Sequence, residues 1–211
     1  FGRIASYRNG FPTLGLNPGI SEDGRIVAFW ADFTGRVVGA LPPDTQNIST
    51  TGPGIFAFVN SQQITKDNFS KTSKLFRVAG LATNSQLDPG EYWADTVRDG
   101  QFNPASEQAI GPIYGIEPDT PIRVNNNGMV VFLGTDAANR KCIFASKVNI
   151  GNDKYPVADP YEVVAIGDSI PGLDGVLVDI ALQDPLGGGK LPGEVAFWAH
   201  MSSGQDAVVV A

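Results

Sequence analysis

Few residues of this sequence have the types and spacing that catalysis requires. The 211-residue chain contains one histidine, His200, and one cysteine, Cys142. Ser202, Ser203 and many aspartates are available for a Ser-His-Asp set with this histidine, but no nucleophile-elbow motif accompanies it. Cys142 lies in the apolar run KCIFAS, which favours a buried structural thiol over a reactive one. We therefore expect no catalytic residue and no enzymatic activity.

Metal and phosphate sites have equally weak signals. One histidine and one cysteine cannot make a conventional zinc site. The segment at 167–175, GDSIPGLDG, offers Asp168 and Asp174 as oxygen ligands for calcium, although its spacing is not that of an EF-hand. Turn capping is the competing interpretation of both aspartates. The segment PLGGGKLPG at 185–193 lacks the flanking glycine and hydroxyl residue of a phosphate-binding loop, so we expect no cofactor.

Sugar chemistry is the remaining alternative. Aromatic rings stack on sugars, and Tyr92, Trp93 and Tyr114 stand in or near expected loops, where they bind a ligand or pack beneath the loop. A polysaccharide hydrolase would also need two carboxylates across a cleft. The carboxylates that could serve such an enzyme are Asp32, Asp95, Asp99, Glu107 and Glu117.

The composition is that of a folded chain rich in turns. The sequence is 42% hydrophobic and 18% charged, and its 25 glycines and 15 prolines suit many short strands joined by turns. A net charge of −7 disfavours a nucleic-acid partner. No apolar run approaches the ~20 residues that span a bilayer. The first residue, Phe1, is compatible with a processed product.

A repeated apolar block organises the chain. VAFWA occurs at 27–31 and again at 195–199, and the near copy VVFLG stands at 130–134. When the blocks are aligned on their central phenylalanine, both alternating faces are apolar, so we expect each strand to be covered on both sides. The aromatic side chains should form the core because they bury large areas. The predicted core residues are Phe29, Trp30, Phe132, Phe144, Phe197 and Trp198.

The residues around each block extend it into a repeat unit. Turn residues precede every block, and a second apolar strand follows it. The first copy has one extra residue before Phe29, which we expect a β-bulge to absorb. The expected units cover 13–80, 122–167, and 176–211 together with 1–12, with an elaborated insertion at 82–121 that is either a degenerate fourth unit or a functional loop.

The N-terminal strand of the chain is part of this scheme. GRIAS at 2–6, with the residues after it, resembles the segment at 163–175 that follows the second unit. We therefore predict that this strand completes the C-terminal unit, either in its own chain or in a neighbouring copy. The whole of 1–211 is expected to be a single repeat-built all-β domain.

The blocks resemble a known repeat type. Asn125–Gly128 followed by Phe132 is similar to the bacterial secreted tandem repeats written NxxGxxFxAxV, which themselves resemble the β-propeller repeats of TolB-like proteins. The segment at 163–172 resembles the linker between such repeats. This resemblance implies a propeller-like array of antiparallel sheets outside the cell, and it brings no catalytic residues. About three units, or four with the insertion, are visible here, whereas propellers usually have four to eight blades.

The sequence thus favours an all-β, propeller-like, non-enzymatic structural or interaction module. We expect it to be extracellular or on the cell surface, with a periplasmic location as the alternative. Its expected partners are proteins, including copies of itself joined by strand exchange, and glycans are a further candidate. A carbohydrate-binding module or a polysaccharide-active enzyme on the same scaffold is the competing function.

Overall fold

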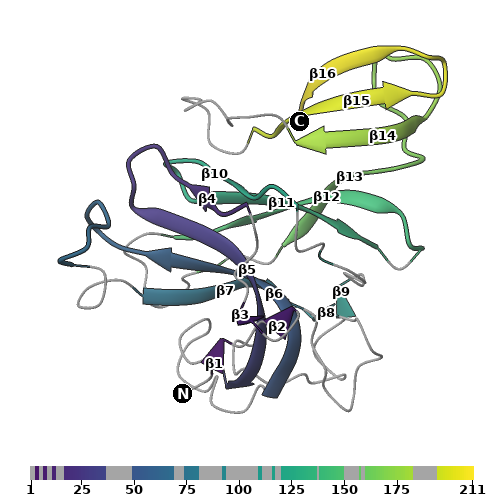
Figure 1. Ribbon diagram of the computed structural model, residues 1–211. Helices are drawn as coiled ribbons and strands as arrows, with labels where there is room; N and C mark the ends of the chain where they lie inside the picture. Colours follow the sequence, from purple (N-terminus) through teal and green to yellow (C-terminus); the bar gives the residue numbers. More distant parts are fainter. Residues whose placement is uncertain are drawn as a thin grey trace.

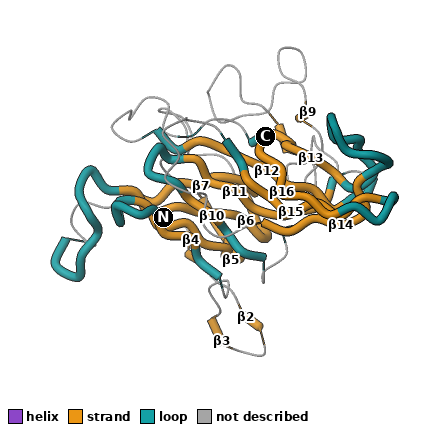
Figure 2. The backbone as a smooth tube through the Cα atoms, turned by 90° about the horizontal axis from the view of Figure 1, so that it is seen from above, coloured by secondary structure: helices purple, strands orange, loops and turns teal. Residues whose placement is uncertain are grey.

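The described part of the protein is built from β-strands. The computed structural model describes residues 3–4, 7–8, 11–12, 17–36, 49–68, 74–80, 92–93, 109–110, 116, 120–136, 138–149, 157, 160–182 and 194–211. These residues form antiparallel strands and no helix. Three main sheets lie in layers, with the second sheet between the first and the third (Figure 1). Seen from above, the strands of the three sheets overlie one another (Figure 2).

The three sheets follow one another along the chain. The first contains β1 (Arg3–Ile4), β4 (Gly19–Ile20), β5 (Ile26–Arg36), β6 (Ser49–Val59) and β7 (Lys74–Gly80). The second contains β10 (Arg123–Val124), β11 (Met129–Thr135), β12 (Lys141–Lys147) and β13 (Tyr161–Ala165). The third contains β14 (Leu177–Leu182), β15 (Ala196–Met201) and β16 (Asp206–Val210). Two further short pairs are β2 (Tyr7–Arg8) with β3 (Phe11–Pro12), and β8 (Tyr92–Trp93) with β9 (Ala109–Ile110).

The strand register repeats from sheet to sheet. Phe29 lies opposite Phe56 in the first sheet, and Phe132 lies opposite Phe144 in the second. Phe197 lies opposite Val209 in the third. The next pairing also repeats, because the register shifts directly before Phe56 in β6–β7 and directly before Phe144 in β12–β13. The apolar blocks therefore occupy equivalent strands, β5, β11 and β15.

The hairpin before each of the first two blocks has the expected turn chemistry. Gly24 and Gly128 have φ values of 67° and 86°, which side chains rarely adopt. Four residues separate the paired Ser21 and Ile26 in the first hairpin, and three separate the equivalent pair in the second. The extra residue of the first copy therefore lies in the turn. The expected β-bulge is not needed, since a longer loop leaves the strand register intact.

The sheets are joined face to face in one order. We call the side of each sheet that carries the central phenylalanine of its block the Phe face, and the other side, with Trp30, Leu133 or Trp198, the Trp/Leu face. The Trp/Leu face of the first sheet packs on the Phe face of the second. The Trp/Leu face of the second sheet packs on the Phe face of the third.

Both interfaces are filled with large buried side chains. Phe132 is fully buried in the first interface, and its ring stacks on Phe144 at a centroid distance of 5.8 Å. Ile143 and Phe197 are fully buried in the second. Burial of apolar area stabilises the fold by roughly 25 cal/mol per Å², so the layers hold one another together. In the part of the chain that is described, the layers form a stack and no closed ring.

The N-terminal strand lies elsewhere than expected. Arg3 and Ile4 pair with Thr34 and Phe33 at the end of β5, in the first sheet, so the prediction that this strand completes the C-terminal unit is wrong. The long strand β5 explains the difference, because β4 covers only its beginning and leaves the edge near Phe33 available. The chain between β1 and its partner residues in β5 is much shorter than the chain between β1 and a strand near residue 200, so closing it costs less chain entropy.

Candidate functional site

The predicted core residues differ in their burial. Phe29, Trp30, Phe132, Phe144 and Phe197 are all buried. The indole Nε1 of Trp30 also donates a hydrogen bond of 3.2 Å to the carbonyl oxygen of Ile116.

Trp198 corrects the expectation that every block is covered on both sides. It is only half-buried, although it occupies the position of Trp30 in the repeat. The reason is that no sheet of the described chain covers the Trp/Leu face of the third sheet.

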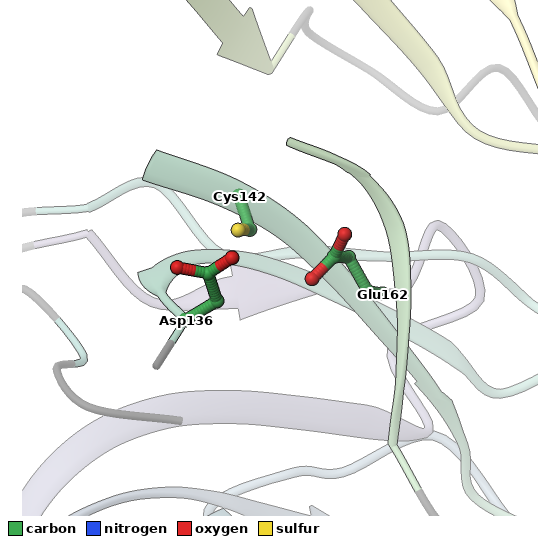
Figure 3. A group of neighbouring side chains, drawn as sticks. All are labelled: Asp136, Cys142 and Glu162. Carbon is green, nitrogen blue, oxygen red and sulfur yellow. The ribbon is translucent and has the colours of Figure 1, made fainter. Parts of the chain in front are cut away.

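A cluster of polar side chains lies at the end of the second sheet. Asp136, Cys142 and Glu162 place a carboxylate oxygen, a sulfur atom and a second carboxylate oxygen within 4.8 Å of one another. The three side chains point toward one another from the β11–β12 hairpin, β12 and β13 (Figure 3). Antiparallel pairing of β12 with β13 places Glu162 opposite Phe144, two residues along β12 from Cys142. A carboxylate, a thiol and a second carboxylate are also the donor types that hold metal ions in proteins.

The guanidinium of Arg140 already balances these acids. Its Nε lies 2.6 Å from Asp136, one Nη lies 3.0 Å from Asp168 and the other lies 3.5 Å from Glu162. Burial raises the pKa of Asp136, but hydrogen bonds from the backbone and side chain of Arg140 outweigh it and hold the pKa below its usual value. A divalent cation at this cluster would have to compete with a cation that the chain itself supplies.

The thiol of Cys142 is not poised for chemistry. Burial, with a contribution from the charge of Glu162, raises its pKa to about 12. At neutral pH the residue is therefore a thiol, whereas nucleophiles and soft-metal ligands are thiolates. The Sγ atom donates a weak hydrogen bond to the carbonyl oxygen of Arg140 at 3.2 Å. The cluster is thus suited to holding the hairpin against β13 and the following turn.

The two calcium candidates have different surroundings in the structure. Asp168 accepts hydrogen bonds from Arg140 and from the backbone N–H of Ala165, at 3.0 and 2.9 Å, which is the turn-capping role. Asp174 is exposed, and its backbone N–H donates to the side chain of Gln205 at 3.3 Å. Neither aspartate belongs to the group of possible metal ligands found in the described residues.

His200 lies on the Trp/Leu face of the third sheet. Its Nδ1 is 2.7 Å from the Oδ1 atom of Asp206, which is directly opposite in β16. Its ring stacks on the indole of Trp198 at a centroid distance of 5.8 Å and an interplanar angle of 15°. The hydroxyl of Ser202 is engaged elsewhere, because it accepts a hydrogen bond from the backbone N–H of Val176 at 3.0 Å. The geometry gives an aromatic pair with a carboxylate beside it.

Two exposed apolar residues of the described chain, Val208 and Val210, lie beside this pair. Val208 is 68% exposed, whereas the residues at the same repeat position, Ile55 and Ile143, are 1% and 0% exposed. Val210 is 62% exposed, whereas its equivalent Ala145 is fully buried. These positions are buried in the first two sheets because another sheet covers them. Among the described residues, no neighbouring sheet covers the Trp/Leu face of the third sheet, although the equivalent faces of the first two sheets are interfaces.

Sequence reasoning missed this face and the Arg140 cluster. The strand AVVVA at 207–211 is apolar on both sides, which gives no sign that one side is exposed. The spacing of Asp136 and Arg140 across a short turn was a signal for their ion pair. The side chains of Tyr92 and Trp93, and the whole of Tyr114, lie outside the described residues. Most of the insertion at 82–121 also lies outside the described residues, so its two interpretations, a degenerate fourth unit or a functional loop, stay predictions.

Comparisons with known proteins add no relative. No family model matches the chain, and no curated protein and no solved structure matches it significantly. The described part of the chain has no helix of the length and apolarity that crossing a membrane requires.

Proposed function

We propose that this protein is a non-enzymatic interaction module that assembles with copies of itself through its C-terminal sheet. The observation that carries the proposal is the uncovered Trp/Leu face of the third sheet, with Trp198, Val208 and Val210. Contiguous exposed apolar residues on a folded protein mark interaction sites. The same face is an interface in both other sheets of this chain.

The proposal includes a propeller-like arrangement outside the cell. Support for the arrangement comes from the repeated stacking, in which each sheet joins the next by the same two faces in the same order. Support for the location comes from the resemblance to secreted tandem repeats and from the acidic composition. Cys142 is buried and its pKa is raised to about 12, so this residue is not available as a nucleophile.

Energetics favour covering this face. Burying a valine side chain contributes about 1–2 kcal/mol, and Val208 and Val210 are both largely exposed to water. Trp198 would add the remaining part of a large aromatic surface. A second copy supplies a surface of the same chemistry, and two-fold pairs of identical surfaces are the commonest form of assembly.

The test is sedimentation velocity of the purified chain over a wide range of concentrations. We expect wild type to associate as its concentration rises, and Val208→Lys to stay monomeric because it places a charge on the face. Ile20→Lys is the matched control, since Ile20 is 61% exposed but lies on β4 of the first sheet. A wild-type chain that is monomeric throughout, or equal effects of the two lysines, would overturn the proposal.

A carbohydrate-binding module is the second candidate. The observation in its favour is the flat pair of Trp198 and His200, with the carboxylate of Asp206 beside it on an exposed sheet. Aromatic rings of this kind stack on sugar faces, and carboxylates accept hydrogen bonds from hydroxyl groups. An oligosaccharide array with wild type and Trp198→Ala tests it: binding that survives the substitution, or no binding by either, argues against this face as a sugar site.

A further inference from the structure

Strand β16 occupies the position of an inner strand, but in the described residues one of its edges is unpaired. It corresponds in the repeat to β6 and β12, since Val209 occupies the position of Phe56 and Phe144. Both of those strands are paired on two sides, β6 with β5 and β7, and β12 with β11 and β13. In the described residues β16 pairs only with β15, and it lies at the outer edge of the third sheet (Figure 1).

The sequence of β16 lacks the devices that protect edge strands. Edge strands usually carry charged residues or proline, or they contain a bulge. The fourth strands of the other two sheets follow this rule: β7 begins with Lys74, β13 contains Glu162, and both have a register shift. Strand β16 has Asp206 only at its start, followed by AVVV. Its register with β15 is regular throughout.

The hydrogen-bonding pattern shows which backbone groups face the open edge. Ala211 exchanges both backbone hydrogen bonds with Val195, at 2.8 and 3.0 Å. In an antiparallel pair such residues alternate with residues whose N–H and C=O groups point away from the partner strand. Val209 therefore bonds to β15, and the outward groups belong to Asp206, Val208 and Val210.

We propose that the open edge of β16 pairs antiparallel with β16 of a second copy of this chain. This joins the two third sheets into one continuous sheet about a two-fold axis near Val208. Each outward N–H and C=O of β16 then gains a backbone partner. Asp206 lies opposite Val210 of the second copy, so the antiparallel arrangement does not oppose like charges.

The composition of β16 suits the place that it would fill. In the second sheet the strand beside β12 is β13, which reads YEVVA. Strand β16 reads DAVVV, with an acidic residue near its start and valines after it. The second copy's β16 therefore resembles the strand that this edge accepts in a complete sheet. Strands β7 and β13 hold this outer position in the first two sheets, and in the described chain both are already paired there.

This inference rests on the proposed function for self-association through the third sheet, and it adds the edge as the contact. The test is the association of Val208→Pro beside Val208→Ile. Proline removes the outward N–H of residue 208 without removing a bond to β15, and such edge positions tolerate proline. Isoleucine keeps that N–H and the apolar side chain. Circular dichroism and thermal unfolding confirm that each variant folds.

We expect Val208→Pro to weaken association about tenfold to a hundredfold, through the loss of one interchain hydrogen bond from each copy. Val208→Ile should associate within a few-fold of wild type. Amide hydrogen exchange gives a second readout in the wild type: protection of the Val208 amide should rise with protein concentration, while that of Val209 stays constant.

The outcomes separate the inference from the proposed function. If Val208→Pro associates as wild type does while Val208→Lys does not, the contact is through the face, and edge pairing is overturned. An unchanged Val208 amide in the associated protein would also overturn it. If wild type does not associate at any concentration, the proposed function fails and the inference fails with it.

Discussion

The repeat offers a comparison between two tryptophans that differ only in what covers them. Trp30 and Trp198 occupy the same position of the VAFWA block. Trp30 is 7% exposed between two sheets, and its Nε1 donates to the carbonyl oxygen of Ile116. Trp198 is half-buried on the open face of the third sheet. We predict that Trp30→Ala destabilises the protein much more than Trp198→Ala does.

The magnitude follows from burial. Truncating a buried tryptophan to alanine costs about 3–5 kcal/mol, and Trp30→Ala also leaves the buried Ile116 carbonyl without this donor. Trp198 already has part of its surface in water, so its truncation should cost about 1–2 kcal/mol. With ~2–4 °C per kcal/mol for a chain of this size, Trp30→Ala should lower Tm by roughly 6–20 °C.

The assay is urea unfolding followed by far-ultraviolet circular dichroism, which does not depend on the tryptophan that each variant loses. It is carried out at a concentration at which wild type is monomeric, so that association does not protect Trp198. Equal losses of unfolding free energy in the two variants would refute the assignment of faces, because they would mean that both indoles are equally covered in the monomer.

Three further predictions test other parts of the structure. Gly128→Ala should destabilise the protein by several kcal/mol, because φ is 86° and a Cβ atom there would collide with a backbone carbonyl; Gly204→Ala, with φ of 85° and open space around it, should cost only about 1–2 kcal/mol by thermal unfolding. Cys142 should react with a thiol reagent at mild alkaline pH only after unfolding in urea, since burial raises its pKa to about 12; labelling of the native protein would contradict that burial. Arg140→Gln should reduce the loss of stability in acid: the folded pKa of Asp136 lies below its usual 3.8, so its contribution is present above that pH and is lost as the pH falls through the folded pKa. An unchanged slope of unfolding free energy against pH in Arg140→Gln would show that the ion pair does not set this dependence.

Local patterns predicted the strands because their signals are local. The alternation of apolar residues around Phe132 gives an extended strand, and the glycine before it gives the tight turn that both hairpins have. Phe132 and Phe144 are as far apart in the sequence as Phe197 and Val209, and in the structure each pair lies opposite across its hairpin. Backbone preference and side-chain alternation act over a few residues, so these features can be read along the chain.

The Arg140 cluster could be predicted only in part. The ion pair with Asp136 spans one hairpin turn, so the two residues are near each other in sequence. Glu162 and Asp168 reach the same guanidinium from β13 and the turn after it. Their approach depends on how β13 returns to pair with β12, which no local pattern states.

The sequence by itself determined the class of fold, the repeated block and the positions of its large aromatic residues. Tertiary structure alone decided which of those residues are covered. Trp30 and Trp198 stand in identical blocks, yet within the described residues a sheet packs against the first and not against the second. The pairing of Arg3–Ile4 with β5 and the open edge of β16 were likewise decided by the path of the chain. The physical reason is that an apolar side chain records a preference for burial, while its actual burial depends on whether a distant segment arrives to cover it.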